Sequence, residues 1–503
     1  MKQWNAIAQQ TMPLVTALQQ CAARSTAAFH TPGHKRGRGV DPVLQALLGD
    51  RVFRADLPEL PELDNLFAPS GVIQQAQELA AQVFGAEQTW FLTNGSTSGV
   101  IAAILATCNP GDKIILPRNV HQSAISGLAL SGAIPIFVNP EYDSHLALAH
   151  GVSPDAIAQT LVQHPDAKAV LIVSPTYYGV SADVAAIAQI IHQHSIPLLV
   201  DEAHGAHFGF HPNLPRSALQ AGADLAVQST HKTLSALTQA AMLHVQGQRI
   251  NRDRLTKALA LIQSTSPNYL LLASLDATRH QLATQGKELM AHSLRLATKA
   301  RSRIAQIPEL SLLDAEQAGS PGFFRLDPTR LTVTVSGLGI TGFTADELLN
   351  EQLGIVAELP TLQHLTFIIS LGNREEDIER LVHGLEWLEG RKPEAGGKRE
   401  DDGVGGDKAV FAWASSLHSA SPSPLSPREA FLVQAEVVSV EAAVGCVSAE
   451  LVCPYPPGIP VLIPGEVITE EAIASLKQVL DAGGIISGCA DPSLTTIKVI
   501  PLE

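Results

Sequence analysis

The stretch QSTHKTLSALTQAAMLHV, Gln228 to Val245, places Lys232 between polar residues and a long apolar run. Such surroundings can desolvate an ammonium, which is how lysines that form Schiff bases become nucleophilic. Asp201 ends an earlier apolar run, in VDEAHG, and a buried carboxylate there needs a cation such as a protonated pyridine nitrogen. These residue types predict covalent chemistry at Lys232, although most lysines are simply solvated surface residues.

A second segment, TNGSTSG, contains the residue types that bind phosphate. Gly95, Ser96 and Thr97 follow an expected strand and begin an alanine- and isoleucine-rich segment with helical character. Hydroxyl groups, backbone N–H groups and the positive end of a helix dipole would then face one anion. The spacing is neither G-x-G-x-x-G nor G-K-[ST], which excludes the dinucleotide and P-loop motifs.

The histidines of HGAHFGFH, His204, His207 and His211, are the residues most suggestive of a metal site. Glycines and a following proline place them in a loop, and no H-E-x-x-H pattern accompanies them. We therefore expect no bound metal.

Five short apolar runs each end in a polar cluster, which indicates strands whose carboxyl ends form one functional edge. Alanine-rich helical stretches separate them, such as Ser181 to Ser195, with Ser181 or Asp183 placed to cap the helix. The pattern predicts an α/β fold with a mostly parallel sheet covered by helices on both faces. The runs are Thr89 to Ser96, Asp112 to His121, Ala169 to Gly179, Ile196 to Gly205 and Asp224 to Lys232.

The composition excludes several classes of protein. With 503 residues, 45% of them hydrophobic, and a formal net charge of −15, the chain favours small cationic substrates and not nucleic acid. The amino terminus lacks a signal-peptide pattern, and no apolar run reaches the roughly eighteen residues of a membrane span. Five scattered cysteines without C-x-x-C are expected to be reduced thiols, so we expect a cytoplasmic protein.

Four motifs in the same order resemble the ornithine/lysine/arginine decarboxylase family, which consists of pyridoxal-phosphate enzymes of fold type I. They are FHTPGHKRG near the amino terminus, DEAHG, STHK, and YPPGIPVLIPGE near the carboxyl terminus. The resemblance begins near residue 25 and implies an aspartate-aminotransferase-like fold with a smaller α+β C-terminal domain. Because the motifs begin by residue 29, we expect no counterpart of the receiver-like amino-terminal domain of the larger members.

The resemblance implies a role for each residue of the site. Lys232 would bind the aldehyde of pyridoxal 5'-phosphate, Asp201 would face the pyridine nitrogen, and Ala203 and His121 would lie on opposite faces of the ring. Ser123 and His204 would stand nearby, and Thr176 would approach the ring hydroxyl, although a turn residue after a strand is an equally good interpretation of Thr176. The phosphate would be bound by Gly95, Ser96, Thr97, Ser229 and His231.

The same resemblance and the composition divide the chain into five parts. The segment RKPEAGGKREDDGVGGDK, Arg391 to Lys408, is glycine-rich and charged, which predicts a linker or a disordered insertion. The parts are an amino-terminal segment bordering the active site (1–70), a large cofactor domain (71–275), a small α/β domain (276–390), a flexible linker (391–427) and a C-terminal decarboxylase domain (428–503).

We expect decarboxylation of a basic amino acid, as in polyamine biosynthesis, by a homodimer or larger homo-oligomer. Arginine is the first substrate to consider, followed by lysine and ornithine. Three carboxylates are candidates to bind the substrate side chain, namely Glu358, Glu466 and Asp276. An aminotransferase of fold type I is the main alternative. A non-catalytic relative is the second alternative, disfavoured because Lys232, Asp201 and His121 occur together.

Overall fold

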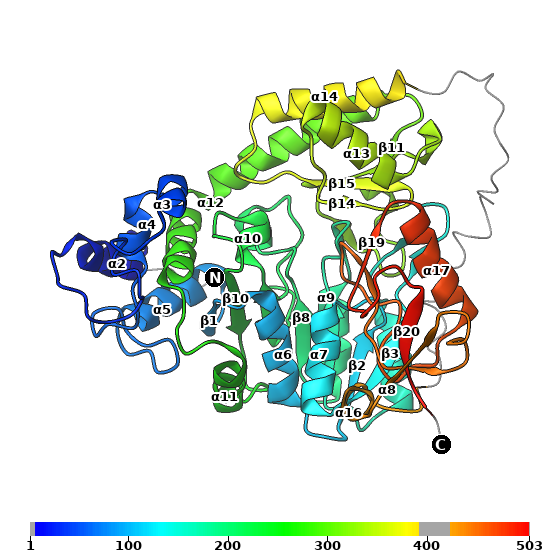
Figure 1. The fold of residues 1–503 in the computed structure, drawn as a ribbon, viewed down its shortest axis with the longest axis horizontal. Helices are drawn as coiled ribbons and strands as arrows, with labels where there is room; N and C mark the ends of the chain where they lie inside the picture. The colour runs from blue at the N-terminus through cyan, green and yellow to red at the C-terminus, as the bar shows by residue number, and fades with distance from the viewer. Residues whose placement is uncertain (1–5, 392–422, 502–503) are drawn as a thin grey trace. The chain divides into compact units, whose positions relative to one another are not determined.

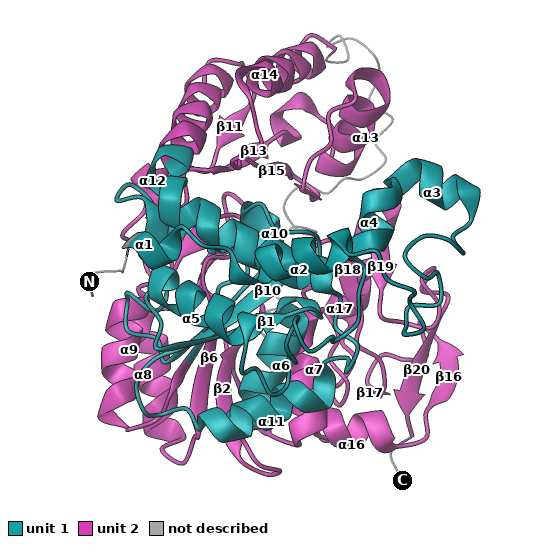
Figure 2. Ribbon diagram, turned by 90° about the vertical axis from the view of Figure 1, so that its left-hand side faces the viewer, with its two compact units in different colours: residues 1–107, 199–290 teal, residues 108–198, 291–503 magenta. Residues whose placement is uncertain are grey.

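The computed structural model describes residues 6–391 and 423–501, which Figure 1 shows as a ribbon. The chain forms two compact units, residues 1–107 with 199–290 and residues 108–198 with 291–503, coloured separately in Figure 2. Of the predicted linker, 391–427, residues 392–422 lie outside the described residues. The four predicted boundaries between the five parts stay predictions.

In the first unit, the strands of the main sheet follow the order β1-β10-β9-β8. β8 and β9 are parallel, whereas β10 is antiparallel to both of its neighbours. Each strand is buried along nearly its whole length, as expected for a sheet covered on both faces. Their bounds are Gln88–Leu92 (β1), Ala241–Val245 (β10), Leu225–Gln228 (β9) and Leu198–Asp201 (β8).

Helix α6 (Gly95–Thr107) begins shortly after β1 and packs against this sheet through a glycine. A Cβ atom on Gly99 would lie 2.6 Å from Val227 Cγ1 of β9 and 2.8 Å from Leu92 Cδ1 of β1. Because only a hydrogen fits there, the helix approaches the two strands closely. Gly95, with a φ of +69°, provides the sharp turn from strand to helix.

The remaining helices of the first unit are distributed along both of its sequence segments. The long helix α12 (Tyr269–Ile304) begins in this unit and continues into the second. The others are α1 (Ala6–Gln9), α2 (Pro13–Ala23), α3 (Pro42–Leu48), α4 (Asp50–Ala55), α5 (Val72–Phe84), η1 (Phe208–Phe210), α10 (Thr230–Thr233) and α11 (Arg252–Ile262).

In the second unit, three strands of the main sheet are parallel and follow the order β6-β2-β3. Helix α7 connects β2 to β3, and α8 lies in the connection from β3 to β6. Asp183 accepts a hydrogen bond from Ala186 N at the start of α9, which confirms the predicted cap. The bounds are Lys113–Pro117 (β2), Ile134–Val138 (β3), Ala169–Val173 (β6), Gln122–Ser131 (α7), Pro154–Gln163 (α8) and Val184–Gln193 (α9).

A four-stranded antiparallel sheet, ordered β11-β13-β15-β14, packs with α13, α14 and the end of α12 around one apolar core. Residues such as Leu331, Leu365 and Leu385 are fully buried in it. The elements are β11 (Ser311–Leu312), η2 (Ala315–Gln317), β13 (Arg330–Thr334), η3 (Ser336–Leu338), α13 (Gly342–Leu353), β14 (Leu359–Pro360), β15 (His364–Ile368) and α14 (Glu375–Glu389). Short pairs β4 (Tyr142–Asp143) with β5 (Leu148–Ala149) and β7 (Val180–Ser181) with β12 (Arg325–Leu326) complete this region.

The C-terminal region, residues 423–501, has a small core of its own around α17. A three-stranded sheet, β16-β20-β17, and a two-stranded sheet, β18-β19, surround this core. This α+β region and the mainly parallel central sheet confirm the predicted fold class. The elements are α16 (Pro427–Leu432), β16 (Glu436–Ser439), β17 (Val447–Ser448), β18 (Cys453–Tyr455), α17 (Glu470–Asp481), β19 (Ile485–Ser487) and β20 (Thr496–Ile500).

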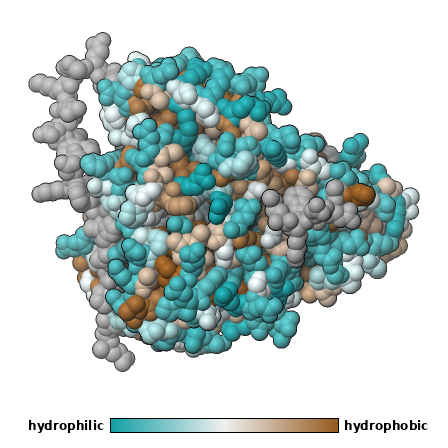
Figure 3. Space-filling view, turned by 180° about the vertical axis from the view of Figure 1, so that it is seen from behind, coloured by the Kyte–Doolittle hydropathy of each residue, from teal (hydrophilic) through white to brown (hydrophobic). Residues whose placement is uncertain are grey.

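Hydrophobic side chains are scattered among hydrophilic ones on the face drawn in Figure 3. Within residues 6–391 and 423–501, each helix is too short or too polar to cross a lipid bilayer.

Candidate active site

Lys232 lies in α10, directly beyond the carboxyl end of β9, and its side chain is only partly buried. Its Nζ atom is 3.0 Å from Nε2 of His204, which follows β8. Of the apolar residues that follow Lys232, Leu234 is buried and Leu237 is 50% exposed, so desolvation of the ammonium by this segment stays a prediction. Residues Ala241–Val245 form β10, because a buried strand between β9 and β1 requires those apolar side chains.

Asp201 is the last residue of β8 and is 7% exposed. Burial raises the pKa of its carboxyl group, and both the charge of Lys232 and a hydrogen bond from Ala203 N to Oδ1, at 3.1 Å, oppose that rise. A buried carboxylate of this kind remains ionised where a cation lies beside it. Ala203 is itself buried, and its small side chain follows the carboxylate by two residues.

The predicted phosphate-binding residues of the first unit come from two elements that the structure brings together. Ser229 Oγ, beyond β9, donates a hydrogen bond of 2.8 Å to Ser96 Oγ in the first turn of α6. Thr97, in the same turn, is exposed. His231 Nδ1 lies 2.9 Å from the carbonyl oxygen of Ala240, so this ring nitrogen holds the start of β10 in place.

His121 and Ser123 form a local pair at the start of α7 in the second unit. His121 is the N-cap residue, and its Nδ1 accepts a hydrogen bond from Ser123 N at 3.2 Å and lies 2.8 Å from Ser123 Oγ. When Nδ1 of a neutral imidazole accepts a hydrogen bond, the hydrogen of the ring is on Nε2. The ring orientation is therefore fixed by the helix that it caps.

Thr176 lies in the tight turn between β6 and β7. Its hydroxyl oxygen accepts a hydrogen bond from Val180 N at 3.3 Å, and its carbonyl oxygen accepts one from Gly179 N at 3.0 Å. These contacts favour the turn interpretation that the sequence left open. The hydroxyl hydrogen can still be donated to another group.

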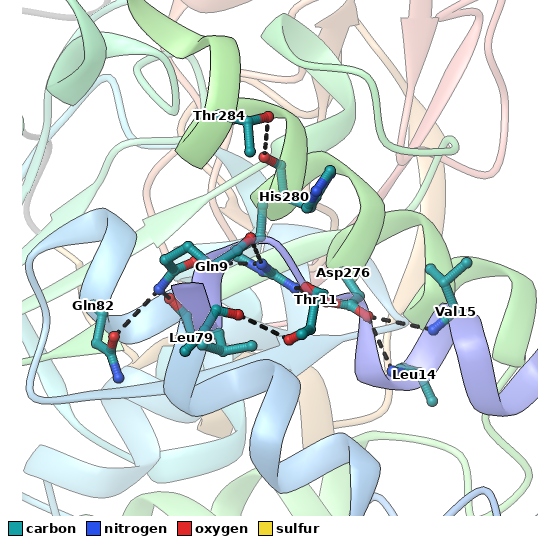
Figure 4. Close-up of polar contacts among 11 residues, drawn as sticks. Gln9, Thr11, Leu14, Val15, Leu79, Gln82, Asp276, His280 and Thr284 are labelled. Carbon is teal, nitrogen blue, oxygen red and sulfur yellow. Dashed lines mark hydrogen bonds and ion pairs between the residues drawn. The ribbon is translucent and has the colours of Figure 1, made fainter. Parts of the chain in front are cut away.

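Two of the three carboxylates considered for the substrate side chain are bound to buried arginines. Asp276 on α12 pairs with Arg279, and its Oδ2 accepts from Leu14 N and Val15 N, which attaches α2 to α12 (Figure 4). Glu466 pairs with Arg118 at 3.0 Å. Glu358 is exposed and stays a candidate.

A buried polar network lies beside Asp201, and no motif in the sequence indicates it. Glu202 accepts hydrogen bonds from Ala218 N at 2.7 Å and from Gln228 Nε2 at 2.8 Å. Gln228 Oε1 lies 3.1 Å from His244 Nε2, and His244 Nδ1 lies 2.8 Å from Thr89 Oγ1, so the network spans β8, β9, β10 and β1. Burial raises the pKa of Glu202 to about 8 and lowers the pKa of His244 to about 3.

The donor set of the first unit fits pyridoxal phosphate. A primary amine suits the aldehyde, a buried carboxylate suits the protonated ring nitrogen, and paired serine hydroxyls at a helix N-terminus suit the phosphate. Beside Ser229, the hydroxyl of Thr230 is buried and finds no hydrogen-bond partner among the described residues. Together, the amine, the carboxylate and the serine hydroxyls would bind the aldehyde, the ring nitrogen and the phosphate of one pyridoxal phosphate molecule.

Comparisons with known proteins agree with this chemistry. The family model described as Orn/Lys/Arg decarboxylase, major domain, matches residues 12–377, and the C-terminal domain model of that family matches residues 415–483. The chain is 41% identical to an arginine decarboxylase of Bacillus subtilis over 98% of this chain and 99% of that protein. It is 39% identical to an arginine decarboxylase of Halalkalibacterium halodurans over 98% of each chain.

A solved lysine decarboxylase of Francisella novicida has the same fold. The TM-score is 0.81 at 23% sequence identity, covering 98% of this chain and 82% of that chain.

Proposed function

Because the chain belongs to the Orn/Lys/Arg decarboxylase family and is an amino-acid decarboxylase, we propose that its substrate is arginine. Two relatives of about 40% identity, 41% and 39%, that match along the full chain are named arginine decarboxylases. The net charge of −15 suits a cationic substrate. We further propose that the amine product is used in polyamine synthesis, as the family resemblance implies.

We propose pyridoxal 5'-phosphate as the cofactor, which the family implies. When bound, it supplies an electron sink for the electron pair that remains at Cα as CO₂ departs. Lys232 would hold the aldehyde carbon and Asp201 would face the ring nitrogen. The phosphate would be held by Gly95, Ser96, Thr97, Ser229 and His231. This assignment rests on one observation, namely that the first unit contains all four residues that the cofactor needs: Lys232, Asp201, Ser96 and Ser229.

The protein side chains move the protons of the reaction. Loss of CO₂ must be followed by delivery of one proton to Cα, and we propose that Lys232 Nζ delivers it. His204 Nε2, 3.0 Å away, can exchange a proton with that nitrogen. Asp201, facing a protonated ring nitrogen, would favour the charge distribution that forms when CO₂ leaves.

We propose further cofactor contacts for His121, Ser123 and Thr176, as the family resemblance implies. His121 would lie on one face of the cofactor ring, opposite Ala203, with Ser123 fixing the imidazole through its bonds to Nδ1. Thr176 would donate its hydroxyl hydrogen toward the ring hydroxyl. We also propose a cytoplasmic location, since all five cysteines are free thiols, as in proteins of reducing compartments. Fractionation of cells that express the protein tests the location.

Replacing Lys232 with alanine tests the function. We expect Lys232→Ala to release no amine from arginine over many turnovers, because the only proposed covalent attachment for the cofactor is lost. The variant should keep the wild-type circular dichroism and thermal midpoint, since Lys232 is partly exposed. Sustained multiple-turnover release of CO₂ and amine by this variant would show that another residue carries the chemistry.

A further inference from the structure

A proline-rich loop of the C-terminal region, Pro456–Pro460, is bonded to the strand-end segments that follow β2 and β6 in the same unit. We call it the proline loop. Tyr177 Oη donates a hydrogen bond of 2.7 Å to Pro457 O, and Gln122 N donates one of 3.1 Å to Gly458 O. Gly458 N in turn donates to Pro454 O at 3.0 Å. The bond to Pro454 therefore ties the proline loop to the strand before it. The carbonyl oxygens of Pro457 and Gly458 tie the loop to the two strand-end segments.

A buried arginine anchors the far end of the proline loop. Arg118, directly after β2, donates to Pro460 O at 2.8 Å and Val461 O at 2.9 Å, and to Glu466 Oε2 at 3.0 Å. The side chains of Arg118 and Glu466 are only 2% and 7% exposed. A buried charge that loses its partner costs free energy. The ion pair between Arg118 and Glu466 therefore favours contact between the C-terminal region and the segment that carries His121.

Gly458 lies close to the imidazole of His121, with room for no more than a methyl group between them. A Cβ atom on Gly458 would be 3.5 Å from His121 Nε2 and 3.4 Å from Gln122 Nε2. Its φ of +78° is a conformation that side chains other than glycine rarely adopt. The ring is thus held at Nδ1 by Ser123 and covered at Nε2 by the loop.

We propose that the proline loop is a positioning element of the active site, which fixes the imidazole of His121 in the orientation needed for catalysis. This inference rests on the proposed function in one respect, namely that His121 contacts the cofactor. Tyr177 and Gly458 are positioning residues, because they act through His121 and the backbone beside it. Removal of the Tyr177 hydroxyl loosens the loop, whereas a side chain at position 458 displaces it.

The first test measures His121 in the full-length, cofactor-free protein. Diethyl pyrocarbonate acylates neutral imidazole nitrogens, and mass spectrometry of the His121 peptide gives the rate of modification. In Tyr177→Phe the loop loses one hydrogen bond, so we expect His121 to react roughly fivefold faster than in the wild type, the factor for one such bond. The matched control is Tyr455→Phe, because Tyr455 is 54% exposed in the neighbouring strand; we expect the wild-type rate.

Equal rates for His121 in the wild type and in Tyr177→Phe would overturn the inference. So would equal acceleration in Tyr177→Phe and Tyr455→Phe, because that result would indicate general loosening of the C-terminal region. This test needs no cofactor or substrate. Its failure is therefore distinguishable from failure of the proposed function, which would appear as absence of amine from arginine in the wild type.

The second test uses the cofactor-loaded enzyme and Gly458→Ala. We expect kcat for arginine to fall severalfold with KM near the wild-type value, since alanine is strained in the left-handed conformation of position 458 and relief of that strain moves the loop beside His121. The absorption band of the bound cofactor should shift, because under the proposed function the imidazole would lie against the cofactor ring. A wild-type kcat and an unshifted band, or a change confined to KM, would overturn the inference.

Discussion

Asp201 and Glu202 are adjacent carboxylates with different uses. Asp201 is held near Lys232, where a positive charge lowers the cost of its ionisation. Glu202 faces Gln228 and Ala218 N instead, with no cation among the contacts that raise or lower its pKa. We therefore propose a chemical role for Asp201 and a role in the stability of the sheet for Glu202.

Glu202 makes folding depend on pH. Its pKa of about 8 in the folded protein lies above its ordinary value of 4.5, so the folded state holds a proton that the unfolded state releases. The resulting stabilisation is complete below the lower value and is lost as the pH rises through the higher one. Between those values, the free energy of unfolding should fall by up to about 1.4 kcal/mol per pH unit from this group.

Urea unfolding of Glu202→Gln at about pH 5 and about pH 8 tests this dependence, because an amide does not titrate. We expect a smaller loss of stability between the two pH values in the variant than in the wild type. Glu78→Gln, at an exposed position of α5, should retain the wild-type loss. Parallel pH dependence in wild type and Glu202→Gln would contradict a protonated Glu202 in the folded state.

At the scale of elements, the site depends on how closely α6 approaches β9. Ser96 is in the first turn of that helix and Ser229 follows that strand, and their hydroxyls meet at 2.8 Å. The approach requires glycine at position 99, whose substitution would place a methyl group 2.6 Å from Val227. The packing of one helix therefore sets the geometry of the proposed phosphate site.

Gly99→Ala should destabilise the fold by roughly 1–3 kcal/mol, the usual cost of overpacking a core. It should also weaken binding of pyridoxal phosphate, since the start of α6 moves away from Ser229. Gly372→Ala is the matched control: no heavy atom lies within 4 Å of the added methyl group, and we expect a change below about 0.5 kcal/mol. Chemical unfolding and cofactor titration measure both effects, and equal stabilities of the two variants would argue against tight packing at Gly99.

The short helix α3 suggests that the whole molecule associates with a second copy. None of its residues is buried, and Val43 and Leu47 are 79% and 78% exposed. Exposed apolar clusters of this kind mark interaction surfaces. We predict sedimentation at twice the chain mass of 53.3 kDa or more, and a shift toward the single-chain mass in Val43→Glu/Leu47→Glu. A wild-type protein that sediments as one chain would contradict the predicted homodimer.

The sequence predicted those parts of the molecule that depend on local pattern. Each of the five apolar runs contains a strand, Asp201 ends β8 and Lys232 follows β9, because polar residues after a buried run mark the edge of a sheet. It did not predict β10, since a short apolar run can be a strand or part of a helix. Nor could it predict that Gly458 lies against His121, because no local periodicity reports a contact between distant segments.

Product analysis of the wild-type enzyme tests the central claim most directly. Arginine, lysine and ornithine are supplied separately to the purified protein loaded with pyridoxal phosphate, and CO₂ and the organic product are identified for each. We predict that arginine yields its amine with one CO₂ per amine, and that its kcat/KM exceeds those of the other two amino acids. A keto acid in place of an amine, or a higher kcat/KM for lysine or ornithine, would contradict the proposed arginine decarboxylase activity.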